Sequence, residues 1–318
     1  MSNVDDAYEL LAAGEPLRAI ALLRTSGMAG DAACYRELAV WFLDGRYVPR
    51  DLAQSRENFR HAGDLGDLTA EHVFICFLAN GTGGRADWQG AKARLSKLAA
   101  VDERAARQLE VFGVMRLTAD GDPLTKPTSE LISNQPEAWR FPDFASSAEC
   151  DYLIGVAIPL LQQSVVVDPT TGQIGPHPIR TSEGAMFPYV SEDLVVSALN
   201  RRIASASGTG LRCGEPLQIL RYRPGQQYRP HSDALPATDN QRVLTALVYL
   251  NAGYEGGETF FTRTRLKFGG KTGDALLFRN AAAGGRPDPD AEHAGLPVLR
   301  GEKYIASRWI REFPMTTP

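Results

Sequence analysis

Residues 217–233 read LQILRYRPGQQYRPHSD, and this segment carries the clearest structural signal in the chain. Its first part, Leu217–Tyr222, is a short run rich in apolar and β-branched residues, which is typical of a strand. The Pro224-Gly225 pair then predicts a turn. Beyond it stand His231 and Asp233, whose side chains point to one face if the backbone is extended. An imidazole and a carboxylate so placed can bind one metal ion, although His-x-Asp alone occurs by chance in many chains.

Two residues farther along make the metal site more specific. Of the five histidines in the chain, His293 also lies beside strand-like sequence. Two histidines and one aspartate form a facial triad that leaves coordination positions open, which suits Fe(II) and the activation of O₂. A buried ammonium without a partner strongly disfavours the folded state. Lys303 is therefore predicted to pair with the distal carboxylate of a dicarboxylate cosubstrate. Zinc would accept the same three ligands, but a zinc hydrolase site would give Lys303 no role at this spacing.

The sequence around these residues is rich in short strands. Runs of β-branched and aromatic residues, separated by Gly, Pro and Asn, recur at 243–250, 259–261, 275–278 and 303–310. Short strands that follow one another in this way predict an antiparallel sandwich or jelly roll. We expect two helices before them, at 147–163 and 191–205. The Pro- and Ser-containing stretch 123–136 is interpreted as a linker or a first strand.

The first part of the chain has a different pattern. Apolar residues, mostly Ala and Leu, recur at three- and four-residue intervals, which predicts successive helices. The pattern repeats, because Gly45 and Asp51 are matched by Gly81 and Asp87. The aspartate can cap the second helix of each pair, and stacked pairs share one core. We therefore expect an α+β chain of two domains, with helical repeats over 1–120 and a strand-rich domain over 121–318.

The helical repeat carries short motifs of a known type. They are Leu38-Ala39, Leu43-Asp44-Gly45, Asp51-Leu52-Ala53 and Ala62-Gly63-Asp64-Leu65-Gly66. Together they resemble the Sel1-like branch of the tetratricopeptide repeats, over residues from about 30 to 115. Such repeats usually bind peptides or proteins, so the resemblance implies an interaction domain. A generic helical bundle is the alternative.

Seven motifs occur in a fixed order along the second part of the chain. They are Phe144 with Glu149-Cys150, Arg180-Thr181-Ser182, and the segments 217–233, 241–251, 255–261, 273–278 and 293–304. In this order they resemble the catalytic domain of the prolyl 4-hydroxylase family of 2-oxoglutarate- and Fe(II)-dependent dioxygenases. The resemblance implies a double-stranded β-helix, or jelly roll, with supporting helices.

The resemblance also implies roles for matching residues. Three of them would bind Fe(II): His231, Asp233 and His293. Lys303, helped by the Thr259 hydroxyl, would bind the distal carboxylate of 2-oxoglutarate. Tyr222 would hydrogen-bond the cosubstrate from the opposite wall, and Trp309 would close the pocket floor. A structural role is the alternative, with both aromatic residues in the core and Thr259 present only as a strand former.

The reaction that the resemblance implies is hydroxylation of a prolyl residue in a peptide or protein, giving succinate and CO₂, with ascorbate as a reductant. Tyr228 and Arg242 match substrate contacts of the family, and the helical repeats would help to recruit the substrate. Arg311, in the place of a frequent histidine, and the segment 281–292 are individual features that leave the substrate open. The alternatives are hydroxylation of another side chain or of a small molecule, and a helical-repeat binding protein with an inactive oxygenase scaffold.

The bulk composition excludes several other classes of protein. The net charge of −4, from 34 basic and 38 acidic residues, gives no reason to expect nucleic acid as a partner. No apolar run approaches the roughly 20 residues that cross a bilayer, and the N-terminus lacks the features of a secretory signal. The scattered cysteines, Cys34, Cys76, Cys150 and Cys213, predict buried reduced thiols. These features together predict a cytoplasmic protein with no membrane partner.

Overall fold

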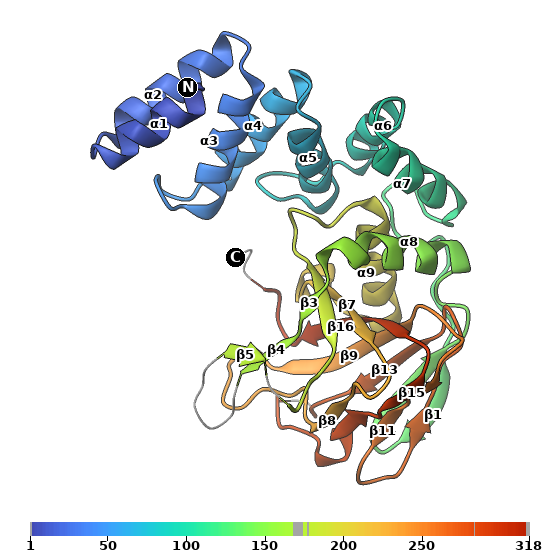
Figure 1. Cartoon of the computed structure of the whole chain (residues 1–318). Helices are drawn as coiled ribbons and strands as arrows, with labels where there is room; N and C mark the ends of the chain where they lie inside the picture. The colour runs from blue at the N-terminus through green and yellow to red at the C-terminus, as the bar shows by residue number, and fades with distance from the viewer. Residues whose placement is uncertain (1, 168–173, 177, 283, 316–318) are drawn as a thin grey trace. The chain divides into compact units, whose positions relative to one another are not determined.

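The computed structural model describes residues 2–167, 174–176, 178–282 and 284–315. The chain forms two compact units (Figure 1). The first comprises Met1–Gly121 with Tyr189–Ser197, and the second comprises Asp122–Pro188 with Ala198–Pro318. The short segment 189–197 thus belongs to the helical unit although it lies far along the chain. Within the described residues, no helix combines the length and the apolar character needed to span a membrane.

The first unit is built from consecutive helices that pack each against the next. Their bounds are α1 (Asn3–Ala12), α2 (Pro16–Met28), α3 (Ala32–Asp44), α4 (Leu52–Asp64), α5 (Leu68–Asn80), α6 (Trp88–Leu98) and α7 (Glu103–Val114). Small buried side chains such as Ala39, Ala62 and Ala91 lie between the helices and allow close packing.

The predicted repeat appears as two helix pairs, α3–α4 and α5–α6, with the same turn between their members. The first helix of each pair ends at a glycine in the left-handed conformation, with φ of 73° at Gly45 and 79° at Gly81. This backbone conformation favours glycine because it has no Cβ. The second helix of each pair begins at an aspartate, Asp51 or Asp87, whose carboxylate accepts a backbone N–H of the first turn. The sequence repeat is therefore a repeat of helix caps.

The second unit contains two antiparallel sheets. The eight-stranded sheet has the order β1 (Glu130–Asn134), β2 (Glu137–Phe141), β13 (Ala275–Arg279), β9 (Arg242–Tyr249), β16 (Lys303–Arg311), β7 (Leu217–Tyr222), β6 (Glu183–Phe187) and β3 (Gln162–Gln163). The four-stranded sheet has the order β12 (Lys267–Phe268), β11 (Thr259–Phe261), β14 (His293–Gly295) and β8 (Tyr228–His231). Short ribbons pair β10 (Glu255–Gly256) with β15 (Val298–Arg300) and β4 (Val165–Val167) with β5 (Ile174–Pro176). The helices of this unit include α8 (Ser147–Ala157) and α9 (Leu194–Ser207) from Ala198 onward, the first turn of α9 being assigned to the first unit.

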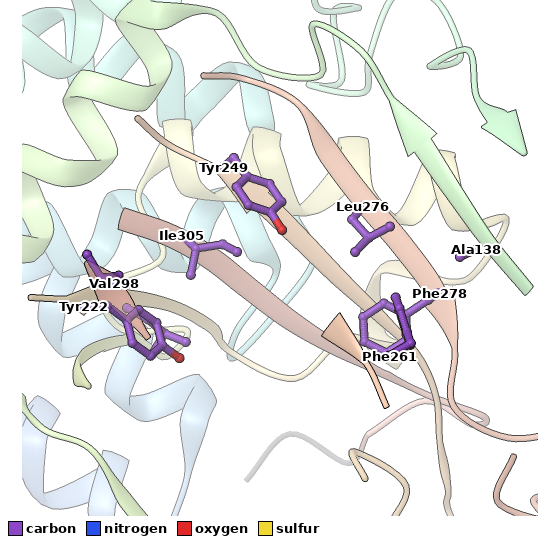
Figure 2. Packing of buried hydrophobic residues seen from close by; sticks show 9 residues of the cluster. Ala138, Tyr222, Tyr249, Phe261, Leu276, Phe278, Val298 and Ile305 are labelled. Carbon is purple, nitrogen blue, oxygen red and sulfur yellow. The ribbon is translucent and has the colours of Figure 1, made fainter. Parts of the chain in front are cut away.

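The apolar core of this unit lies between the two sheets (Figure 2). Phe261 of the four-stranded sheet meets Phe278 of the eight-stranded sheet edge to face, with ring centroids 5.1 Å apart. Tyr222, Tyr249 and Ile305 extend the same buried cluster along the larger sheet. Two facing antiparallel sheets with a shared core form a double-stranded β-helix, or jelly roll, so the predicted fold class is confirmed.

The predicted strands agree closely with the observed ones, whereas the helices differ at their ends. The helix expected over 147–163 ends at Ala157, because Pro159 cannot continue the hydrogen-bond ladder and the chain turns into β3. The helix expected from 191 begins at Leu194, where the Asp193 carboxylate accepts the N–H of Val195 at 3.0 Å. The stretch 123–136 contains β1, as the first-strand interpretation expected. All four cysteines are buried and free, as predicted.

Candidate active site

The predicted metal ligands meet on the four-stranded sheet. His231 is the last residue of β8 and lies opposite His293, the first residue of β14. Asp233 follows β8 and lies beyond the end of the strand, so the turn after β8, and not a shared strand face, brings its carboxylate to the histidines. One nitrogen or oxygen atom from each of the three residues lies within 4.8 Å of the others.

Both imidazoles are oriented in the same way. The Nδ1 atom of His231 lies 2.8 Å from the Arg229 carbonyl oxygen, and that of His293 lies 2.9 Å from the Ala291 carbonyl oxygen. A carbonyl can only accept, so Nδ1 carries a proton in each ring. The Nε2 atoms lie 3.5 Å (His231) and 3.7 Å (His293) from oxygens of Asp233. With Nδ1 bonded to a backbone carbonyl, Nε2 is the atom of each ring that can bind a metal.

The charge states also fit a divalent metal ion. Burial, with a smaller effect of the nearby His231, lowers the pKa of His293 to about 4, so this ring is neutral at physiological pH. Burial tends to raise the pKa of Asp233, but the two histidines and the Thr245 hydroxyl outweigh it and hold that pKa below its usual range. Two imidazole nitrogens and an ionised carboxylate are the donor set of a 2-His-1-carboxylate iron site.

Lys303 lies on the opposite sheet, at the start of β16. Its ammonium donates to the Gly257 carbonyl oxygen at 2.6 Å and lies 5.6 Å and 5.1 Å from the ring centroids of Tyr222 and Tyr249. No carboxylate of the described residues lies within salt-bridge distance of it, and its side chain is buried. Burial lowers its pKa to about 8. A buried cation with no carboxylate at salt-bridge distance in the described residues is suited to an anionic ligand.

These residues line one pocket, with about 460 Å³ of empty space including the part that is open to solvent. Lys303, Ile305, Ser307 and Trp309 line it from β16, because alternate residues of a strand face the same side. Eight residues singled out from the sequence lie in its wall: Tyr222, Tyr228, His231, Asp233, Thr259, His293, Lys303 and Trp309.

Three predicted residues have clear supporting contacts in the pocket wall. Tyr222 lies beside Lys303 on the neighbouring strand of the same sheet, since the two are paired in the register of β7 and β16, and not on an opposite wall as expected. Thr259 is buried, and its hydroxyl oxygen lies 2.9 Å from that of the fully buried Tyr249. Tyr228 stacks on His231 with ring centroids 3.5 Å apart and planes 14° apart.

Arg242, which was predicted to contact substrate, does not line the pocket. Its guanidinium lies over the Trp309 ring at 3.7 Å and donates two hydrogen bonds to the Glu215 carboxylate, at 2.6 Å and 2.9 Å. Arg311 donates to the same carboxylate at 2.5 Å. Glu215 thus holds both arginines beside Trp309, and a substrate contact by Arg242 stays a prediction.

One pocket residue was quoted as part of a motif, but the sequence did not indicate its role. Arg180 is buried, lies 5.1 Å from the Tyr228 ring centroid, and donates to Ser182 at 3.3 Å and to Gln218 at 3.4 Å. Among the described residues it forms no salt bridge. The Arg180-Thr181-Ser182 motif was the only available signal, because burial of an arginine in a loop leaves no periodic pattern.

Comparison with known proteins agrees with this geometry. Residues 217–311 match the family model described as the 2OG-Fe(II) oxygenase superfamily. Prolyl 4-hydroxylase 1 of Arabidopsis thaliana is 39% identical over 202 residues, which cover 58% of this chain and 71% of that protein. Prolyl 4-hydroxylase 5 of the same plant is 35% identical over 210 residues, covering 58% and 72%.

Two solved structures resemble different parts of the chain. A viral collagen prolyl hydroxylase from Paramecium Bursaria Chlorella virus-1, in a 2OG complex, is 32% identical and covers 55% of this chain and 96% of its own, with a TM-score of 0.46. A Sel1 repeat protein from Oxalobacter formigenes is 23% identical and covers 34% and 85%, with a TM-score of 0.30.

The jelly roll, the facial set of two histidines and one aspartate, and the matching family model define an Fe(II)- and 2-oxoglutarate-dependent dioxygenase. Within that class, the chain belongs to the prolyl 4-hydroxylase family. Its N-terminal helical repeats form a separate compact unit.

Proposed function

We propose that this enzyme hydroxylates prolyl residues of a peptide or protein, with Fe(II) bound by His231, Asp233 and His293 and 2-oxoglutarate bound by Lys303. The observation that carries the proposal is the convergence of these side chains on one pocket, with an ammonium that forms no salt bridge within the described part of the chain. The prolyl substrate is inferred from relatives that bear the name prolyl 4-hydroxylase.

Bound iron would activate O₂ and couple the conversion of 2-oxoglutarate to succinate and CO₂ to hydroxylation of a C–H bond. The residues of the chain position the reactants. Lys303 would neutralise the distal carboxylate of 2-oxoglutarate, with Thr259 and Tyr222 beside it. The Tyr228 ring would hold the prolyl ring near the metal, and Arg180 would donate to a peptide carbonyl.

The direct test is incubation with proline-containing peptides, Fe(II) and 2-oxoglutarate. We expect succinate release and a +16 Da product that is absent from matched peptides with alanine in place of proline. Hydroxylation of the alanine peptides at another side chain would contradict the prolyl assignment while leaving the reaction class intact. Failure of the chain to bind Fe(II) and 2-oxoglutarate at all would overturn the whole proposal.

The affinity for 2-oxoglutarate is expected to fall as the pH rises above about 8. The pKa of Lys303 is lowered to about 8, so the ammonium that would bind the carboxylate is present below this pH and is lost above it. Between pH 8 and pH 9.5 the dissociation constant should rise roughly tenfold per pH unit. Calorimetric titration under anaerobic conditions measures this, and an affinity that is flat to pH 9.5 would contradict it.

The helical repeats are proposed to recruit the substrate protein. Repeats of this architecture present extended surfaces that bind peptides. If the repeats contribute, the full chain should use a protein substrate with a higher kcat/KM than a short peptide that fills only the pocket. Equal kcat/KM values for the two would count against recruitment. The cytoplasmic location and the use of ascorbate stay predictions, which localisation of the natural protein and ascorbate-dependent turnover would test.

A further inference from the structure

A buried chain of hydrogen bonds leads from the proposed metal ligand Asp233 into the core of the larger sheet. Thr245, in the middle of β9, has its hydroxyl oxygen 2.7 Å from Oδ2 of Asp233. Asn280, which follows β13, places its Nδ2 atom 2.8 Å from the Thr245 hydroxyl oxygen. Both side chains are fully buried, with no exposed surface. Neither residue was singled out from the sequence.

The direction of these hydrogen bonds is fixed by chemistry. An ionised carboxylate only accepts, so the single proton of the Thr245 hydroxyl must point to Asp233. The hydroxyl oxygen must then accept its second hydrogen bond, and the amide NH₂ of Asn280 provides it. A chain of bonds with one direction polarises each member, and in a buried setting this strengthens the last bond, the one to the carboxylate.

Asn280 lowers the stability of the folded state at this position, which points to a role other than packing. Its Oδ1 atom is buried and has no hydrogen-bond partner among the residues that the structure describes, and a buried unsatisfied polar atom disfavours the folded state. Its backbone is fixed from both sides, because its N–H donates to the Val243 carbonyl at 2.9 Å and its carbonyl accepts from the N–H of Asp288 at 2.8 Å. The side-chain amide is therefore held in place to donate to Thr245.

We propose that Thr245 and Asn280 are positioning residues for the metal site, an inference that rests on the proposed function. The Thr245 hydroxyl donates to Oδ2 of Asp233, the oxygen that also lies 3.7 Å from Nε2 of His293, and so opposes rotation of the carboxylate. This would leave Oδ1, which lies 3.5 Å from Nε2 of His231, available to bind the metal. Residues that orient a metal ligand in this way typically change metal affinity by about 10–100-fold when they are replaced. A role in packing alone would not depend on the hydroxyl proton.

The test uses variants of Thr245 that separate the effect of its hydroxyl group from the effect of its branched side-chain shape. Thr245→Val keeps the branched shape and removes the hydrogen bond, whereas Thr245→Ser keeps the hydroxyl. The readout is the affinity of the full chain for Mn(II) alone, measured from the electron paramagnetic resonance signal of the free ion. We expect about 10–100-fold weaker binding for Thr245→Val and for Asn280→Ala, and binding within about threefold of wild type for Thr245→Ser.

The double variant Thr245→Val/Asn280→Ala should bind Mn(II) as tightly as the single variant with the lower affinity. The two losses do not add, because the two residues act in series on one carboxylate. Thr209→Val is the matched control, since within the described part of the chain its hydroxyl bonds to Ser207 alone, and it lies outside the pocket lining. Thermal unfolding of each metal-free variant shows whether it folds. If Thr245→Val does not fold, Asn280→Ala and Thr245→Ser still decide the outcome.

Two results would overturn the inference. Wild-type Mn(II) affinity in both Thr245→Val and Asn280→Ala would show that the hydrogen-bond chain does not position Asp233. Equal losses in Thr245→Ser and Thr245→Val would show that packing, and not the hydroxyl, matters. Neither result would affect the proposed function, provided that the wild-type protein itself binds Mn(II). Absence of Mn(II) binding in the wild-type protein would overturn the proposed function and this inference together.

Discussion

Replacement of Asp233 by alanine is expected to remove metal binding and reduce succinate release by at least about three orders of magnitude. The carboxylate is the only anionic ligand in the cluster of His231, Asp233 and His293, and it is buried between the two imidazoles. Two histidines without the carboxylate bind a divalent ion weakly, and the metal supplies several kcal/mol of stabilisation to the reaction. Metal analysis after dialysis and a succinate-release assay measure the two effects.

The matched control for this variant lies in the same loop. Asp239 is exposed and lies outside the pocket, so Asp239→Ala should keep wild-type metal content and turnover. Removal of the buried carboxylate also removes the acceptor of the Thr245 hydroxyl, so the fold of Asp233→Ala must be verified by its thermal unfolding. A folded Asp233→Ala that retains stoichiometric iron and turnover would rule out the proposed ligand set.

Replacement of Lys303 by alanine should weaken 2-oxoglutarate binding by roughly 30-fold to several thousand-fold, because loss of one partner from a buried charge pair costs about 2–5 kcal/mol. Mn(II) binding should be unchanged, since the ammonium lies on the opposite sheet from the metal ligands. The expected pattern is therefore a large rise in the KM for 2-oxoglutarate with full metal occupancy. Anaerobic calorimetry with 2-oxoglutarate measures the affinity directly.

Lys267→Ala is the control for Lys303→Ala, because Lys267 is an exposed lysine of the same unit outside the pocket. Arg180→Gln distinguishes the contribution of Arg180 to 2-oxoglutarate binding from that of Lys303, the other buried cation that lines the pocket. If Lys303→Ala binds 2-oxoglutarate normally while Arg180→Gln does not, then Arg180 is the carboxylate clamp and the assignment of Lys303 is wrong. Lys303→Arg should recover only part of the affinity, because the planar guanidinium is larger than the ammonium that the pocket accommodates.

Local patterns in the sequence were sufficient for the fold class and for most of the pocket wall. Strands such as Leu217–Tyr222 show apolar and β-branched runs that depend on near neighbours only, and the cap residues Gly45 and Asp51 act within one helix turn. The alternation along β16 also sufficed to place Lys303 and Trp309 on one face. Helix ends were less exact, because the effect of Pro159 competed with an apolar pattern that continues past it.

Only the tertiary structure decided which side chains act together across the sheets. Asn280 supports Thr245, and Thr245 supports Asp233, from three segments that are far apart in the sequence. The pairing of Arg242 with Glu215 and the inclusion of 189–197 in the helical unit depend in the same way on how distant strands and helices are brought together. The sequence by itself determined the residue types and the periodic elements, which arise from backbone geometry over a few residues. The partners of buried polar groups are set by long-range packing, and no local pattern records them.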